Sequence, residues 1–166
     1  MGERFVKTRI MVFMACLVLG ACSTAIETRT AMPQNIQHDL VVDEVVVSAE
    51  KSVKIEQSAL DRLKTAVENG FAAQISGTQP VHVSLNVKDF KIQSEAGRLF
   101  LGAFMGANYM DVRVVVTSDA GMTLAEFDVR RESNPGGYGA FYSQTDATVD
   151  ETAEGIVNAV MGKTGG

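Results

Sequence analysis

The stretch Val81–Lys88, VHVSLNVK, decides the fold. Its valines and its leucine occupy every second position, and polar residues fill the positions between them. Because successive side chains of a strand point to opposite faces, this alternation predicts a strand in a sheet that buries one face. After Asp89 the apolar positions move to Phe90 and Ile92, and this change of phase predicts a bulge near Lys88 and Asp89.

Three other segments have the pattern of strands. The ranges 40–47, 112–116 and 124–129 are rich in β-branched or alternating apolar residues. Between the last two lies Ser118-Asp119-Ala120-Gly121, whose residue types are typical of a hairpin turn. We therefore expect about four strands, most of them antiparallel.

Two amphipathic helices are expected, over 58–71 and 148–160, because apolar residues recur there at intervals of three and four. Ser58 with Asp61, and Thr148 with Glu151, have the spacing of a capping box at a helix start. The order β-α-β-β-β-α predicts an α+β fold. It is a two-layer sandwich, with both helices on one face of the sheet.

The N-terminal segment has the parts of a secretory signal peptide. Basic residues precede an uncharged stretch over 10–21, which is shorter than the ~20 residues that a membrane-spanning helix needs. The sequence Leu19-Gly20-Ala21-Cys22 at its end resembles the lipobox of bacterial lipoproteins, in which the cysteine is acylated and becomes the first mature residue. An uncleaved N-terminal helix, or a plain secretory signal with Cys22 incidental, are the alternatives.

This interpretation divides the chain into four parts. Residues 1–21 are a signal peptide, 22–38 a flexible tether, 39–162 a single α+β domain and 163–166 a disordered tail. Cleavage removes Cys16 and acylation consumes Cys22, so no disulfide forms in the mature chain. In Gram-negative lipoproteins, an aspartate directly after the acylated cysteine resembles a retention signal for the inner membrane. Ser23 occupies that position here, so we expect a lipid anchor in the outer membrane, at its periplasmic face.

The charge balance argues against two kinds of partner. The whole chain carries a formal charge of −5, and residues 22–166 hold 12 basic and 19 acidic residues, a formal −7. An acidic surface repels phosphate backbones, which disfavours nucleic acid, and it also disfavours electrostatic adsorption to anionic lipid. The acyl group, rather than charge, is the expected attachment to the membrane.

A glycine-bearing apolar run over 97–110 does not fit a simple two-layer domain. It contains a small-xxx-small pattern from Gly102 to Gly106, which lets two backbones approach closely. Three interpretations stay open: a connection under the sheet, a surface for self-association or a partner protein, and a segment that inserts into the membrane. The candidate interaction residues are Gly97, Leu99, Phe100, Gly102, Phe104 and Gly106.

Signals for catalysis are weak. The two histidines, His38 and His82, are expected in the tether and on the polar face of a strand, and no zinc or calcium spacing occurs. No Gly-x-Ser-x-Gly motif is present. We expect no enzymatic activity, no cofactor and no metal. Four strand carboxylates are expected to face solvent: Asp43, Glu44, Glu126 and Asp128.

The region 81–162 resembles an uncharacterised family of bacterial outer-membrane lipoproteins whose domain has no assigned function. The alternating strand, the 97–106 segment and the hairpin over 114–127 carry this resemblance, which supplies no catalytic residues. It implies a lipid-anchored periplasmic protein with an accessory, structural or protein-interaction role in the cell envelope. The alternatives are an oligomeric pore or secretion-complex subunit that inserts 97–110, and a carrier for a small apolar ligand.

Overall fold

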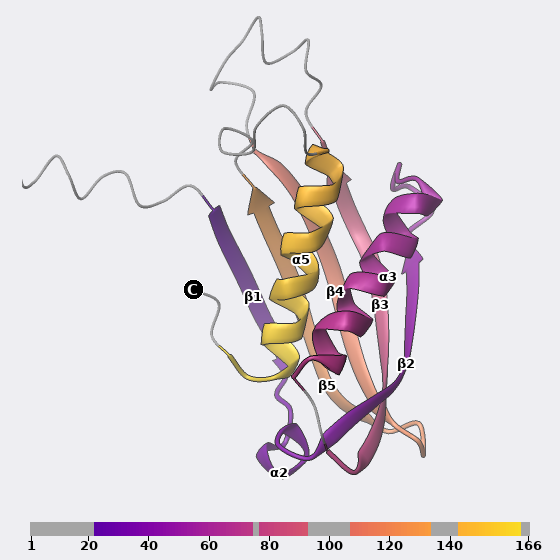
Figure 1. The fold of residues 1–166 in the computed structure, drawn as a ribbon, viewed down its shortest axis with the longest axis vertical. Helices are drawn as coiled ribbons and strands as arrows, with labels where there is room; N and C mark the ends of the chain where they lie inside the picture. Colours follow the sequence, from indigo (N-terminus) through magenta and orange to yellow (C-terminus); the bar gives the residue numbers. More distant parts are fainter. Residues whose placement is uncertain (1–21, 75–76, 93–106, 134–142, 164–166) are drawn as a thin grey trace, which may run out of the picture.

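The computed structural model describes residues 22–74, 77–92, 107–133 and 143–163 as a five-stranded sheet with helices on one face (Figure 1). The elements in chain order are β1 (Cys22–Thr30), α2 (Gln34–Gln37), β2 (Leu40–Ala49), α3 (Gln57–Ala72), β3 (Gln79–Lys91), β4 (Asn108–Ser118), β5 (Thr123–Ser133) and α5 (Gln144–Val160). Figure 1 shows α3 and α5 lying side by side across the sheet. The predicted α+β class is confirmed.

The sheet is mixed, with strand order β1-β5-β4-β3-β2. β2 and β3 are parallel and are joined by α3, whereas every other neighbouring pair is antiparallel. The predicted bulge is confirmed, because the register between β3 and β4 shifts between Val87 and Asp89. The predicted hairpin joins β4 to β5, with Gly121 at a φ of 76°.

The core lies between the sheet and the two long helices. The alternating apolar residues of β3, at 81, 83, 85 and 87, are no more than 1% exposed. Opposite them α3 buries Leu63, Val67 and Phe71, and α5 buries a longer set that includes Ile156 and Val160. One face of the sheet is therefore apolar and covered, as the alternation over 81–88 predicts.

The expected tether over 22–38 differs from what the structure shows. Cys22–Thr30 form β1, an edge strand antiparallel to β5, and Gln34–Gln37 form the short helix α2, with His38 at its C-terminal cap. The strand lacks a clear apolar period because only Ile26 packs against the core. Backbone pairing with β5 holds it instead, so the sheet of the described residues has five strands where about four were expected.

Both helices begin earlier than their capping-box signals suggest. The N-cap of α3 is Glu56, and the N-cap of α5 is Ser143, whose side chain accepts a hydrogen bond from the backbone N–H of Asp146. Thr148 lies fully buried within α5 and donates from its hydroxyl to the carbonyl of Gln144 at 2.9 Å. The predicted caps are therefore interior residues of the helices.

Candidate functional site

The most informative place for function is the end of the sheet where β1 begins, which we call the Cys22 end. Cys22 pairs with Ser133, the last residue of β5, and Ser133 pairs on its other side with Asn108, the first residue of β4. Because neighbouring strands lie about 4.8 Å apart, the backbones of Cys22 and Asn108 lie about 10 Å apart. Lys91, at the end of β3, is next along this edge through its pairing with Tyr109.

The candidate interaction residues Gly97, Leu99, Phe100, Gly102, Phe104 and Gly106 lie outside the described residues. The residues on either side of this segment are described by the structure. Ile92 follows the last residue of β3 and Ala107 precedes the first residue of β4, so the segment leaves and rejoins the sheet at the Cys22 end. Cys22 and the two residues that flank the glycine-bearing segment are 70 or more residues apart in sequence, yet they lie at one end of the fold.

Beneath α5, the same end contains a polar cluster rather than a purely apolar core. The guanidinium of Arg131 lies 3.1 Å from the carboxylate of Glu151, and their side chains are only 16% and 12% exposed. Arg131 also donates to the hydroxyl of Thr24 on β1. Asn108, 1% exposed, donates to the side-chain carbonyl of Gln144 at 3.2 Å. These contacts tie the first half of α5 to β4 and β5, and Arg131 links the cluster to β1.

On the face of the sheet opposite α3 and α5, which we call the open face, charged residues gather around Asp128. This carboxylate is 7% exposed, which corrects the expectation that it faces solvent. It accepts hydrogen bonds from Arg29 at 2.7 Å and Arg113 at 3.1 Å, and Lys88 lies 3.4 Å away. Burial alone would raise the pKa of Asp128. The hydrogen bonds from Arg113 and Arg29 and the charge of Lys88 outweigh burial and lower its pKa to about 2.

Nearer the Cys22 end, the open face carries an aromatic ring held by charges. The guanidinium of Arg130 lies 4.1 Å from the centre of the Tyr109 ring, a cation–π distance. The hydroxyl of Tyr109 donates to Asp89 at 2.8 Å, and this hydrogen bond to a carboxylate raises the pKa of Tyr109. The Tyr109 ring is therefore held in place on the charged face, and its hydroxyl group stays protonated at neutral pH.

The residues considered for metal binding or acid–base chemistry do not form such a site within the described ranges. His82 has Asp119 at 3.2 Å and Glu44 at 3.9 Å, and its imidazole is one-third exposed. Asp43 and Glu44 are exposed, as expected. No group of three or more histidine, cysteine, aspartate or glutamate side chains suited to a metal ion occurs among the described residues.

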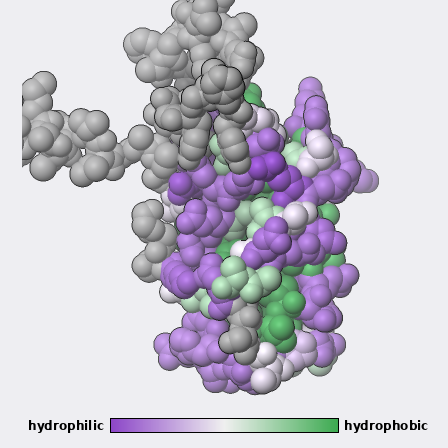
Figure 2. Space-filling model, in the orientation of Figure 1, coloured by the Kyte–Doolittle hydropathy of each residue, from purple (hydrophilic) through white to green (hydrophobic). Residues whose placement is uncertain are grey.

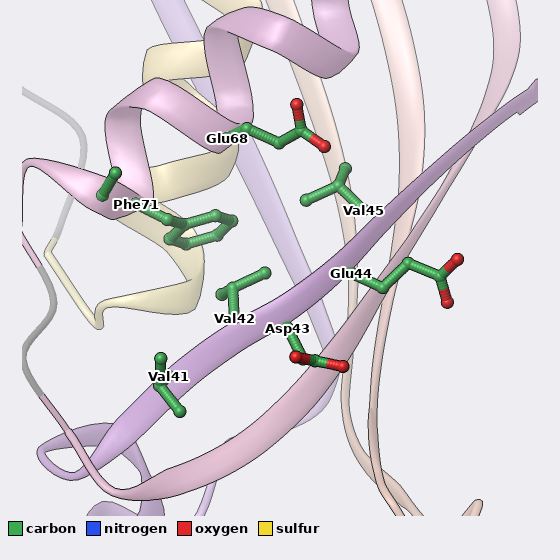
Figure 3. Close-up of a pocket in the computed structure, with 8 residues that line it drawn as sticks. Val41, Val42, Asp43, Glu44, Val45, Glu68 and Phe71 are labelled. Atoms are coloured by element: carbon green, nitrogen blue, oxygen red, sulfur yellow. The ribbon is translucent and has the colours of Figure 1, made fainter.

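A hollow of about 230 Å³ opens between β2 and the end of α3. Phe71 of α3 points toward Val42 and Val45 of β2, and Asp43 and Glu44 lie along the same strand (Figure 3). Figure 2 shows a helix-side face that is mostly hydrophilic, with apolar surface gathered in its lower part. Val41 and Val46 of β2 are 37% and 48% exposed, which is high for valines on a strand.

A second hollow, of about 380 Å³, lies at the opposite edge of the sheet. Its apolar lining comes from Ile26 of β1, Met32 and Phe127, and its polar lining includes Gln37 and Lys163. Both hollows are on the helix side of the sheet. Both lie away from the Cys22 end, because one adjoins the start of β2 and the other the end of α5.

A membrane-crossing helix does not occur in the part of the chain that the structure describes, since no helix there is both long enough and apolar enough. No known family profile matches this sequence, and no curated protein is similar to it in sequence.

Solved structures do resemble this fold. The PelC dodecamer from Paraburkholderia phytofirmans has a TM-score of 0.51 at 11% identity, over 86% of this chain and 100% of that one. A substituted form of the same PelC has a TM-score of 0.49 at 11% identity, over 84% and 97%. A candidate lipoprotein from Caulobacter crescentus CB15 has a TM-score of 0.40 at 16% identity, over 74% and 93%. Identities this low make the likeness to PelC one of fold alone.

Proposed function

We propose that this chain is a lipid-anchored, non-enzymatic structural subunit of the bacterial cell envelope, which stands on the periplasmic face of the outer membrane and associates with copies of itself. The observation that carries the proposal is the position of Cys22 as the first residue of β1. An acyl group at this residue would be attached directly to the folded sheet, with no linker between the lipid and the domain.

Without a linker, the acyl group would hold one end of the folded domain close to the membrane. A strand rises about 3.3 Å per residue, so the first residues of β1 would hold the Cys22 end within a few ångströms of the lipid headgroups. The connection between β3 and β4 starts and finishes at this end and would face the membrane. The hairpin between β4 and β5 and the short helix α2 would project into the periplasm.

Self-association is supported by the fold. The similar PelC fold crystallises as a dodecamer, and its likeness extends over most of the present chain. The described surface also offers binding features rather than a reaction centre: a charged open face whose ion pairs satisfy one another, and two apolar hollows at the sheet edges. We therefore propose assembly, rather than catalysis, as the activity of this domain.

Anchoring is tested by labelling bacteria that produce the full chain with a clickable palmitate analogue, then separating membrane and soluble fractions. Wild type should take up the label and fractionate with the outer membrane, whereas Cys22→Ser should take up none. Cys16→Ser is the matched control, because that residue lies inside the proposed signal peptide and should not affect labelling. Labelling of Cys22→Ser at the wild-type level would overturn the anchor.

Self-association is tested on the full chain after detergent extraction, by light scattering with the detergent mass subtracted. We expect an assembly larger than a dimer at micromolar concentration. A strict monomer would refute this part of the proposal and leave the anchor untouched.

The second candidate function is a pore or secretion-complex subunit that inserts the glycine-bearing run into the membrane. The structure shortens the expected segment 97–110, because its last three residues belong to β4 and Met110 is buried in the core. This second function is favoured by one relationship, the attachment of this segment at the Cys22 end. Phe104→Asp would place a charge in the segment and should prevent insertion, and Gly102→Leu should block close backbone approach. If both variants retain wild-type assembly and wild-type protection from externally added protease, the segment has neither role.

A further inference from the structure

We infer that copies of this chain join edge to edge, with β1 of one copy pairing antiparallel to β2 of the next, so that the sheet continues through the assembly. The inference rests on the self-association proposed above and names its interface. It commits to one occupant for both sheet edges, a second copy of the same chain.

The two outer strands have the backbone needed for this pairing. β1 has only β5 as a neighbour and β2 has only β3, so within the described residues each strand has one unpaired edge. β1 is 9 residues long and β2 is 10. Unpaired edges of this length are templates for another strand unless bulges or charges protect them. The register irregularities lie near one end of each strand, between Thr28 and Thr30 and between Val42 and Glu44, and leave the rest of each strand regular.

Strand direction favours the pairing. β3 runs parallel to β2, and the following pairs β3–β4, β4–β5 and β5–β1 are all antiparallel. β1 therefore runs opposite to β2. When a second copy faces the same way and stands beside the first, its β1 meets β2 in the antiparallel orientation. The contact joins two different edges, so repeating it adds copies in one direction and closes a ring where the rotation permits.

The distribution of charge favours pairing of β1 with β2 over pairing of β2 with a second β2. The β2 edge carries the exposed carboxylates of Asp43 and Glu44, with Glu68 of α3 lining the same hollow. The β1 edge carries the exposed guanidinium of Arg29 beside one exposed carboxylate, that of Glu27, and Lys163 lines the hollow beside it. Pairing β2 with a second β2 would bring carboxylates together, whereas pairing β2 with β1 brings carboxylates to cations.

The two hollows also favour pairing of β1 with β2. Each lies at a sheet edge, on the helix side, away from the Cys22 end, and each has an apolar lining. Pairing β1 with β2 would bring Ile26 and Met32 of one copy beside Val41 and Phe71 of the next. Both hollows would then be closed in one contact, and the exposed Val41 of β2 would gain an apolar neighbour in Met32.

One register satisfies both faces of the joined sheet. With Arg29 opposite Glu44, antiparallel counting places Ile26 opposite Val47 on the helix side. Ala25 and Ser48 are then opposite each other on the open face, where both are exposed. Directly opposite residues of antiparallel strands have Cα atoms about 4.5–5.5 Å apart, a distance that a disulfide spans.

Cysteine cross-linking in the full chain tests this register. Membranes from cells producing Ala25→Cys/Ser48→Cys are oxidised mildly and run on a non-reducing gel, with wild type as the control for the native cysteines. We expect a ladder of covalent oligomers from the double variant and none from either single variant. When extracts that carry the two single variants are mixed before reassembly, they should give dimers only.

Each other outcome identifies a different error. Dimers from Ala25→Cys alone would mean β1 pairs with β1, and dimers from Ser48→Cys alone would mean β2 pairs with β2. Either result overturns the inference. No cross-link in a sample that remains oligomeric by light scattering also overturns it, while self-association stands. A monomeric sample refutes the self-association part of the proposed function, and this inference with it, and leaves the lipid anchor untouched.

A charge reversal gives a second readout without any engineered disulfide. Glu44→Lys should reduce the oligomeric fraction several-fold, because a cation would then face Arg29. Glu154→Lys makes the same change on an exposed position of α5, away from both edges, and should leave assembly at the wild-type level. Equal effects of the two variants would contradict the assigned contact.

Discussion

The carboxylate of Asp128 accepts a 2.7 Å hydrogen bond from the Nε of Arg29, although 99 residues separate them in sequence. Arg29 belongs to the edge strand β1 and Asp128 to its neighbour β5. The same carboxylate accepts from Arg113 of β4, so one buried anion ties three strands together across the open face.

Asp128→Asn should destabilise the fold by about 2 kcal/mol at neutral pH, because it leaves three cations around a neutral amide. The pKa of Asp128 is lowered from 3.8 to about 2 in the folded chain. A carboxylate whose pKa is lower in the folded than in the unfolded chain stabilises the fold at pH values above its unfolded pKa. This stabilisation is lost as pH falls from about 4 toward 2. Urea unfolding at pH 7, 5, 4 and 3 should show the difference between wild type and variant shrinking below pH 4.

Glu132→Gln is the control for this change. Glu132 pairs with Arg130 at 3.1 Å, but both side chains are 40% or more exposed, and such pairs contribute little. Its variant should stay within about 0.5 kcal/mol of wild type at every pH. If Asp128→Asn behaves in the same way, the carboxylate does not hold the strands together.

A second prediction concerns Arg131 and Glu151. Their ion pair lies under α5 with little exposure, so removing one partner takes away a charge-assisted contact from the other where water screens charge poorly. Glu151→Leu and Arg131→Met should each cost about 3 kcal/mol of unfolding free energy. The double variant should cost less than the sum of the two, which a double-mutant cycle measures. Additive losses would show that the two side chains act independently.

A third prediction concerns the contact between α3 and α5. A Cβ placed on Gly70 would lie 2.8 Å from a methyl group of Val157, so the two helices approach closely there. Gly70→Ala gains about 1 kcal/mol of helix propensity but must displace a stiff β-branched side chain. We expect a net loss in wild type and a net gain in a Val157→Ala background, by urea unfolding. A gain in both would mean that the helices are not in contact at Gly70.

The core and the order of the elements from β2 onward were predictable because each signal there is local and repeated. The alternation over 81–88 identified the inner strand β3, and its change of phase located the bulge between Val87 and Asp89. The spacing of apolar residues located both long helices. These patterns report which face of an element is buried, and the buried face is what the two-layer fold is built from.

The edge strand β1 and the buried state of Asp128 could not be predicted in the same way. The helix-side positions of β1 are Thr24, Ile26 and Thr28, so the strand has little apolar alternation. Asp128 occupies an outward position of β5 and is buried by basic side chains from β1, β3 and β4. Both features depend on partners distant in sequence. The meeting of Cys22 with the ends of β3 and β4 depends likewise on sheet order.

The last prediction compares two glycines that are required for different reasons. A Cβ on Gly77 would overlap the backbone carbonyl groups of Asp39 and Leu40, where β2 and β3 begin side by side. The carboxylate of Asp39 accepts from the backbone and the hydroxyl of Thr78 at 3.0 and 2.8 Å, so this junction has no room to widen. Gly121 has a φ of +76°, and a Cβ there would have no atom within 4 Å, so a side chain at this position meets backbone strain alone.

Gly77→Ala should therefore cost about 3 kcal/mol or more in urea unfolding, because backbone must move, whereas Gly121→Ala should cost about 1–2 kcal/mol. Gly121→Asn should recover part of that loss, since asparagine tolerates the left-handed region better than alanine. Amide exchange at Thr78 and Gln79, whose N–H groups both bond to the carbonyl of Asp39, should speed up in Gly77→Ala only. Equal losses from Gly77→Ala and Gly121→Ala would mean that the junction relaxes freely, and the parallel pairing of β2 with β3 would not depend on this close approach.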